Sequence, residues 1–256
     1  MSAATIARRG AAWLAGLLLA AACGQKPSGD AAMATPSDSA APAAAAASDS
    51  GAWRPLVDST LSQWRGYRAQ AVPAGWRVEN GVLMKDGVIG DLLSREQYGD
   101  FELQMEWRLS AGGNAGLFYR ASEQYDHPYW SGPEYQLLDD AGHPDGKNRK
   151  TAAGAAYGLY EAPAGVVRPA GEWNQARLVV RGNHVEHYLN GQRTASYDFG
   201  SPEWTALVKA SKFNDYPAYG RATRGHLAIQ GDHEGVLAIR DLRLRELGAP
   251  AAGARP

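Results

Sequence analysis

Polar side chains suited to sugar chemistry fall on three segments in which apolar and polar residues alternate. In each segment the apolar residues share one parity, so one face packs in the core and the other carries the polar groups. If the three predicted strands lie in one concave sheet, the polar groups line one groove. They are Asn114, Arg120, Glu134, Gln136, His226 and Gln230, with His233 in the turn after the third strand.

These residue types indicate a site for a sugar. Arg, Glu and Gln present directional hydrogen-bond donors and acceptors to hydroxyl groups, and Gly116 and Ala228 leave room for a ring on the same face. Tyr129 and Trp130, just before the second strand, form either a stacking wall or part of the core. The alternative is a solvated outer face with arginine and glutamate paired across strands.

Two other histidines have plainer interpretations. His143 lies in the Asp-rich loop 139–146, which is either a solvated turn, the favoured interpretation, or a calcium loop without EF-hand spacing. His187 shares parity with Val185 and Leu189, which favours a hydrogen-bonded histidine in the core. The chain has no serine-hydrolase elbow, Walker loop or HExxH motif, so the sequence supports none of those chemistries.

The composition limits the remaining possibilities. The chain has 256 residues, and 26 Lys and Arg against 27 Asp and Glu give a net charge of -1. With no positive field to hold phosphates, nucleic-acid binding is excluded. The single Cys excludes a disulfide framework and a thiolate zinc site.

The N-terminal residues 1–23 predict export. Arg8 and Arg9 precede an apolar run at 11–22 that is too short to span a bilayer. Cys23 follows three alanines, as in a bacterial lipobox, which predicts lipidation at Cys23; ordinary signal cleavage is the alternative. Because Gly24 replaces the Asp that favours inner-membrane retention, we expect a lipid-anchored protein of the outer membrane facing the periplasm, with no other membrane contact.

The rest of the chain divides into a tether, one domain and a tail. Residues 24–52 are mostly Ala, Ser, Pro, Asp and Gly and cannot bury enough surface to order themselves. Residues 53–247 form the predicted folded region, and 248–256 a second disordered segment.

Within the folded region the period is two, which is typical of antiparallel sheet. Residues 101–109 place Phe, Leu, Met, Trp and Leu on one face, and Asn190-Gly191 predicts a tight hairpin. Residues 202–211, with Ser201 as N-cap, form the one predicted helix, and a change of phase predicts a bulge near Asp241. The expected fold is an all-β sandwich of two antiparallel sheets with one short surface helix.

An ordered series of motifs carries a resemblance to a known family. Residues 53–247 resemble, nearly end to end, the 3-keto-disaccharide hydrolase domain family, which implies a concanavalin-A-like jelly roll and action on glycosides oxidised at carbon 3. The family usually reads Gln-Asp-His-Gly where this chain has an extra Gly231 before Asp232 and His233. The motifs are WRVENGVL at 76–83, YGDFEL at 98–103, GNAG at 113–116, GPEYQ at 132–136, HPDG at 143–146, RPAGEWN at 168–174, LNG at 189–191 and GHLAIQ at 225–230.

The resemblance implies cleavage by elimination and then hydration, because a ketone at carbon 3 acidifies the proton on carbon 2. On this hypothesis Glu134 is the base, Arg120 stabilises the carbonyl oxygen, and His233 or His226 protonates the leaving oxygen. No cofactor is required, although a divalent metal could replace Arg120.

The polar and aromatic groove residues would bind the substrate: Asn114, Gln136, Gln230, Tyr129 and Trp130. Two other functions remain open. The first is a non-catalytic carbohydrate-binding lipoprotein, since this sandwich also serves lectins. The second is a conventional glycosidase, which needs a second groove carboxylate besides Glu134.

Overall fold

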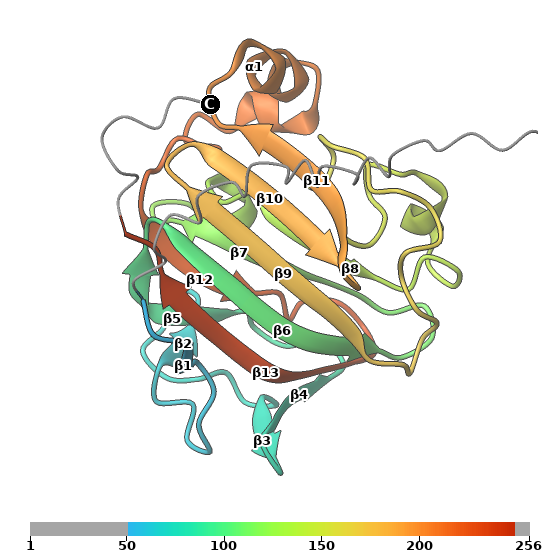
Figure 1. Ribbon diagram of the computed structural model, residues 1–256. Helices are drawn as coiled ribbons and strands as arrows, with labels where there is room; N and C mark the ends of the chain where they lie inside the picture. Colours follow the sequence, from blue (N-terminus) through green and yellow to red (C-terminus); the bar gives the residue numbers. More distant parts are fainter. Residues whose placement is uncertain (1–50, 249–256) are drawn as a thin grey trace, which may run out of the picture. The chain divides into compact units, whose positions relative to one another are not determined.

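The computed structural model describes residues 51–248, which form two antiparallel sheets packed face to face (Figure 1). The predicted concanavalin-A-like sandwich with one short helix is confirmed. Cys23, the export signal, nearly all of the tether and the C-terminal tail lie outside the described residues. In the part of the chain that is described, no helix is long and apolar enough to cross a membrane.

The larger sheet runs, in spatial order, through β11 (Gln192–Asp198), β10 (His184–Leu189), β9 (Asn174–Arg181), β6 (Phe101–Leu109), β13 (Val236–Glu246), β4 (Val82–Asp86) and β3 (Arg77–Glu79), with β1 (Arg54–Pro55) paired to β13. The smaller sheet runs through β2 (Trp64–Gly66), β5 (Leu92–Tyr98), β12 (Gly225–Ile229), β7 (Asn114–Ala121) and β8 (Glu134–Leu138). The helical segments are α1 (Pro202–Lys209) and three 3-10 turns, η1 (Pro128–Trp130), η2 (Pro144–Lys147) and η3 (Lys212–Asp215).

The core lies between the sheets and follows the alternation of the strands. In β6, Phe101, Leu103, Met105, Trp107 and Leu109 are all buried in the main hydrophobic cluster. Each such side chain contributes roughly 1.5–3 kcal/mol when it leaves water. This repeated burial fixes which face of each strand points away from the core.

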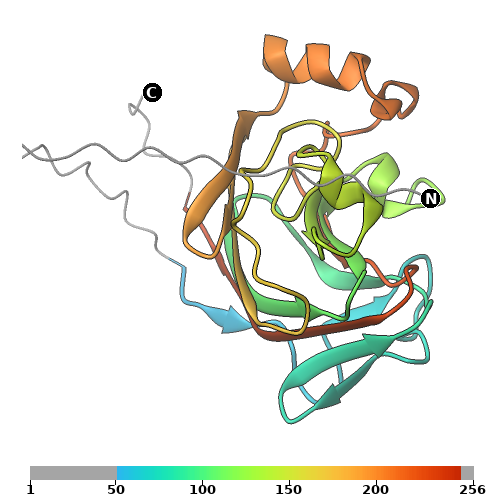
Figure 2. The same cartoon turned by 90° about the vertical axis from the view of Figure 1, so that its right-hand side faces the viewer.

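The predicted local signals are also confirmed. Asn190 and Gly191 both have positive φ, 49° and 84°, as a two-residue hairpin turn requires. Ser201 Oγ accepts a hydrogen bond from Trp204 N and caps α1, which follows β11 (Figure 2). The β13–β6 register shifts between Arg240 and Arg243, which places a bulge at Asp241.

A second bulge, in β7, decides which predicted residues reach the outer face of the smaller sheet. Ala228 of β12 pairs with Phe118, but His226 pairs with Ala121, so two steps along β12 match three along β7. The extra residue is accommodated where Arg120 has a positive φ of 53°. The outward alternation of β7 therefore ends at Phe118.

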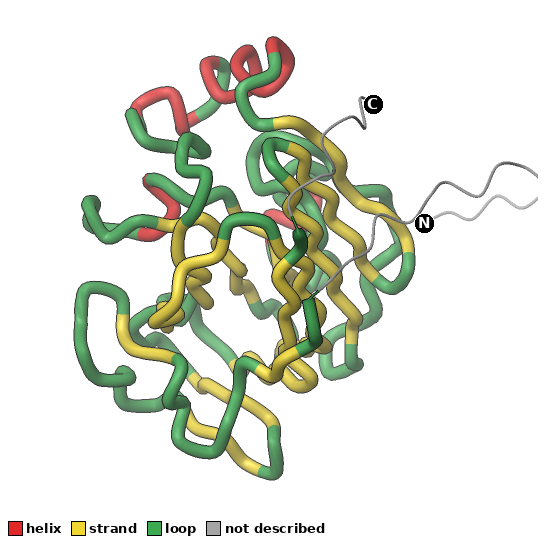
Figure 3. Tube along the Cα trace, turned by 60° about the vertical axis from the view of Figure 1, so that its left-hand side comes forward, coloured by secondary structure: helices red, strands yellow, loops and turns green. Residues whose placement is uncertain are grey.

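The outer face of the smaller sheet is covered by loops and turns, not left open to water. Leu93, Phe118, Ala121 and Ala228 form a small apolar cluster there, and Tyr129 packs against it. Figure 3 shows the helical segments gathered toward one end of the described sandwich. Loop residues on this face, among them His143, Tyr157 and Lys212, line a cavity together with residues of the strands.

Candidate active site

A cavity of about 400 Å³ lies on the outer face of the smaller sheet. The strands contribute amides and a carboxyl group to its floor, and the loops contribute aromatic and charged side chains. The structure brings six predicted site residues together here: Asn114, Tyr129, Glu134, Gln136, Gln230 and His233. Seven further residues line it: His143, Asp145, Tyr157, Lys212, Phe213, Tyr216 and Asp232.

Glu134, the first residue of β8, is the most perturbed acid of the cavity. Its side chain is only 9% exposed and lies directly over Gly116 of β7, where an added Cβ would be 2.1 Å from Oε1. Burial raises the pKa of Glu134 to about 8, and the charge of Lys212 only partly opposes this shift. The carboxyl group is therefore protonated at neutral pH and is available as a proton donor.

Two buried amide oxygens in the cavity wall have no partner among residues 51–248. Gln136 donates from Nε2 to Asn114 Oδ1 at 3.2 Å, but its own Oε1 accepts nothing. Oε1 of Gln230 is likewise unpaired. A buried acceptor without a donor costs about 1–3 kcal/mol, so a ligand that supplies hydroxyl groups here is favoured.

The extra glycine does not displace His233 from the cavity. Gly231 N donates to Asp91 Oδ1 at 2.7 Å, and Gly231 O accepts from Ile89 N at 3.0 Å. Only glycine fits, since a Cβ would lie 2.6 Å from Gly90 O. The tightly held turn brings His233 to the cavity wall.

Burial lowers the pKa of His233. The charge of Asp232, whose Oδ1 lies 3.8 Å from Nε2, opposes this shift, whereas the positive charge of Lys85 reinforces it. The imidazole is therefore neutral at neutral pH, in the form that accepts a proton.

Lys212 is the cation of the cavity, and it is not among the residues predicted from the sequence. Its Nζ lies 4.6 Å from the centroid of the Tyr157 ring and forms no ion pair with any described side chain. Phe213 anchors η3, since its ring stacks on Tyr219 with the centroids 4.1 Å apart. A short 3-10 turn carries no periodic pattern, so no sequence signal pointed to this residue.

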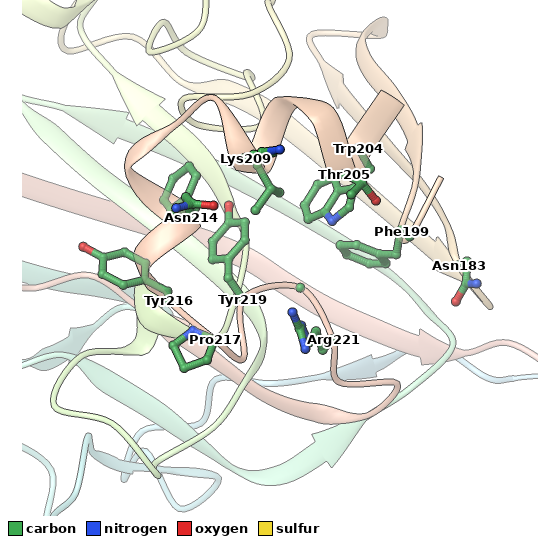
Figure 4. Close-up of a pocket in the computed structure, with 14 residues that line it drawn as sticks. Asn183, Phe199, Trp204, Thr205, Lys209, Asn214, Tyr216, Pro217, Tyr219 and Arg221 are labelled. Carbon is green, nitrogen blue, oxygen red and sulfur yellow. The ribbon is translucent and has the colours of Figure 1, made fainter. Parts of the chain in front are cut away.

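The turn η3 also borders a second cavity, of about 520 Å³, beside α1 (Figure 4). Trp204, Lys209, Tyr219 and Arg221 line it. Phe213 and Tyr216 line both cavities, so η3 forms a shared wall.

Arg120 does not line the candidate active site, so the structure does not support its predicted role at the carbonyl oxygen. The β7 bulge turns this buried residue away from the outer face. Its Nη2 donates to Gly182 O at 2.8 Å and to Gly99 O at 3.1 Å, and its Cζ lies 5.4 Å from the Phe199 ring. Arg120 therefore stabilises loops at the edge of the sandwich through these hydrogen bonds.

His226 is also placed elsewhere. It lines a separate cavity of about 700 Å³, where its Nδ1 donates to Ser94 O at 2.7 Å and its Nε2 lies 3.1 Å from Gln97 Nε2. Ala228 and Phe118 fill the face between the two ends of β12. Of the two histidines considered as the acid, only His233 shares the cavity with Glu134.

The two aromatic residues of η1 have different positions. Tyr129 lines the cavity, and His127 supports its ring by stacking with centroids 4.8 Å apart. Trp130 does not line it but stacks on Tyr216, which does, at 5.2 Å. Tyr129 is therefore a wall residue, and Trp130 buttresses the wall from behind.

The loop 139–146 is more than a solvated turn. His143 and Asp145 line the cavity, and His143 Nδ1 accepts a hydrogen bond from Asp145 N at 3.2 Å. With Asp232 also present, Glu134 is not the only carboxyl group there, contrary to expectation. Across residues 51–248, no three His, Cys, Asp or Glu side chains are grouped so as to hold a metal ion.

His187 is the core histidine that its parity predicted. It is fully buried, its Nε2 lies 3.0 Å from the Tyr119 hydroxyl, and burial lowers its pKa to about 4.

The polar cavity on one face of an antiparallel sandwich is suited to a carbohydrate ligand, and similarity to known proteins assigns the class. The family model of the 3-keto-alpha-glucoside-1,2-lyase-like domain matches residues 52–245, and the chain belongs to this family. It is 33% identical over 220 residues to the 3-keto-disaccharide hydrolase of Bacteroides thetaiotaomicron, with 73% of this chain and 76% of that protein covered. The predicted family is therefore confirmed.

Solved structures agree with this assignment. A proposed glycosyl hydrolase from Parabacteroides distasonis superposes with a TM-score of 0.71 at 30% identity, covering 77% of this chain and 94% of that one. A second from the same species, at 24% identity and a TM-score of 0.61, shares the fold. The relatives support a carbohydrate-active enzyme of the hydrolase type.

Proposed function

We propose that this protein cleaves the glycosidic bond of 3-keto-glycosides by elimination followed by hydration. The observation that carries the proposal is the pair Glu134 and His233 in one cavity, with the pKa of the carboxyl group raised to about 8 and the pKa of the imidazole lowered. When the pKa values of two groups in one site are shifted in opposite directions, one group can serve as the acid and the other as the base. The relative in B. thetaiotaomicron is named for a 3-keto-disaccharide substrate, which supports the substrate class.

The pKa directions reverse the roles first assigned from the sequence. At neutral pH His233 is neutral and Glu134 protonated, so His233 is the base and Glu134 the acid. His233 removes the proton from carbon 2, and the electron pair forms an enolate with the ketone at carbon 3. The enolate collapses to a double bond between carbons 1 and 2, while the leaving oxygen on carbon 1 takes the proton of Glu134.

Lys212 replaces Arg120 as the electrostatic partner of the enolate. It is a cation without a carboxylate partner among the described side chains, held against Tyr157 on the cavity wall. A preorganised charge of this kind stabilises a developing oxyanion by a few kcal/mol. The unpaired oxygens of Gln136 and Gln230 accept hydrogen bonds from sugar hydroxyl groups, with Asn114 beside them, and Tyr129 lies against the ring.

Hydration returns Glu134 and His233 to their starting protonation states. Water adds to carbon 1 as the Glu134 carboxylate takes its proton, and protonated His233 returns a proton to carbon 2. The products are the free alcohol and the 3-keto-sugar, so the sum of both steps is hydrolysis. Each residue ends in the state in which it began.

The location is part of the proposal. We infer that Cys23 is lipidated and that the protein is exported to the outer membrane facing the periplasm. The basic start, the short apolar run and the solitary Cys support this inference.

The reaction is tested with a panel of glucosides and their 3-keto counterparts in heavy water. We expect the keto forms alone to release their aglycone and the product to carry deuterium at carbon 2, since protonated His233 exchanges with solvent. Glu134→Gln lacks the acidic proton and should lose at least about 10²-fold in kcat.

Two results would contradict the proposal. Equal cleavage of the unoxidised glucosides would indicate a conventional glycosidase. Binding of the keto forms without cleavage would indicate a carbohydrate-binding protein.

A further inference from the structure

Lys85 is a buried lysine in an apolar strand position. It lies in β4 with the same inward parity as Leu83, and its side chain is 1% exposed. Lysine is rarely buried, because its ammonium group loses hydration that other polar groups must replace.

Three backbone carbonyl oxygens supply that replacement. Lys85 Nζ donates to Gly87 O at 3.1 Å, to Gly231 O at 3.3 Å and to His233 O. An ammonium group has three donors, so these bonds use all of them. Within residues 51–248 the ammonium forms no ion pair by direct contact. The more distant carboxylates of Asp232, Glu234, Asp86 and Asp91 favour its charged form, whereas burial lowers the pKa of Lys85.

Two of the three acceptors belong to the turn that carries His233. Asp91 and Ile89 hold the same turn from the side of the smaller sheet, through Gly231 N and Gly231 O. Lys85 holds it from the larger sheet, so the turn is fixed to both layers of the sandwich.

We propose that Lys85 is a positioning residue for His233: its ammonium group fixes the turn that presents the imidazole to the cavity and sets a positive charge beside it. The inference rests on the proposed function, in which His233 is the base. A nearby cation disfavours the imidazolium form, so the arrangement keeps the imidazole both in place and neutral.

Other charged and titratable groups face His233, and some of them oppose the effect of Lys85 on its charge state. Asp232 favours the protonated imidazole and Lys85 the neutral one. The groups around the imidazole are Asp232 in its own turn, Lys85 from β4, His143 and Asp145 at η2, Glu134 from β8 and Lys212 from η3.

The test compares Lys85→Met with the full-length wild type. Lys209→Met is the matched control, since it removes an exposed lysine on α1. The first readout is the titration of the His233 imidazole nitrogens by NMR, which needs no substrate. The second is the dependence of kcat/KM on pH with a 3-keto-glycoside.

We expect Lys85→Met to move the His233 titration and the acidic limb of kcat/KM together to higher pH, with no shift in the control. We also expect kcat to fall about tenfold at neutral pH, as for residues that orient a reacting group, with a smaller change in KM. If Lys85→Met does not fold, Lys85→Gln, which keeps a donor and removes the charge, takes its place with the same expectation.

An unchanged His233 titration in a folded variant overturns the proposal. A shifted titration without a shifted acidic limb supports the effect of Lys85 on His233 and refutes His233 as the base. If wild-type protein does not cleave keto-glycosides, the proposed function fails, while the NMR titration still decides the effect of Lys85 on His233.

Discussion

Replacing Glu134 with Gln should make the protein more stable, and increasingly so as the pH rises. In the folded state burial holds the pKa of this carboxyl group at about 8, against an ordinary value of 4.5. Between these values the unfolded chain ionises and the folded protein stays protonated, so stability falls with rising pH. At 1.36 kcal/mol per pKa unit, the loss is about 1 kcal/mol at pH 5 and about 3 kcal/mol at pH 7.

Glutamine has nearly the shape of the protonated carboxyl group and cannot ionise, so the stability of the variant does not decrease with pH for this reason. The assay is urea unfolding followed by tryptophan fluorescence at pH 5, 6 and 7. From pH 5 to pH 7, the free energy of unfolding of Glu134→Gln should rise by about 2 kcal/mol relative to that of wild type. The exposed Glu203 on α1 gives a matched Glu203→Gln control for the loss of one carboxyl group. If the free energies of unfolding of wild type and Glu134→Gln change with pH in parallel, the carboxyl group is not held protonated in the folded state. Glu134 then cannot be the acid.

Four further predictions follow from the same geometry. Lys212→Met should lower kcat about 10²-fold or more with little change in stability, measured by steady-state kinetics and thermal unfolding; equal kcat would remove Lys212 from the mechanism. Arg120→Met should lose about 3 kcal/mol of stability, because buried bonds to Gly182 O and Gly99 O are broken, yet keep wild-type kcat/KM where it is folded; a catalytic defect in folded protein would contradict its placement. The alkaline limb of kcat/KM should fall near pH 8 as the acid Glu134 ionises in the free protein, and a kcat/KM still rising above pH 9 would refute that role. Mass spectrometry of the mature protein should find a lipid-modified Cys23 as its first residue; any other N-terminus contradicts the anchor.

The sequence was sufficient for the fold because its signals are local and periodic. Alternation in β6, the Asn190-Gly191 turn and the Ser201 cap each depend on residues close in the chain. The three groove strands were likewise predicted, and Glu134 and Gln136 lie together in the cavity as expected.

The errors have one physical origin. The parity of β7 holds through Tyr119 and fails at Arg120, because a residue with positive φ there adds one step to the strand, and the alternation within β7 itself does not reveal it. Lys212 reaches the cavity through a 3-10 turn far along the chain, and the burial of Glu134 depends on loops that cover the sheet. Such contacts depend on the tertiary structure, which no local pattern encodes.

Gly116 has a consequence for how this family can vary. The carboxyl group of Glu134 occupies the space that any side chain at position 116 would need, so the two positions cannot change independently. A relative with alanine or a larger residue in place of Gly116 must have moved or shortened its acid. The pair therefore predicts, from sequence alone, which relatives have room for a buried carboxyl group at this place in the sandwich.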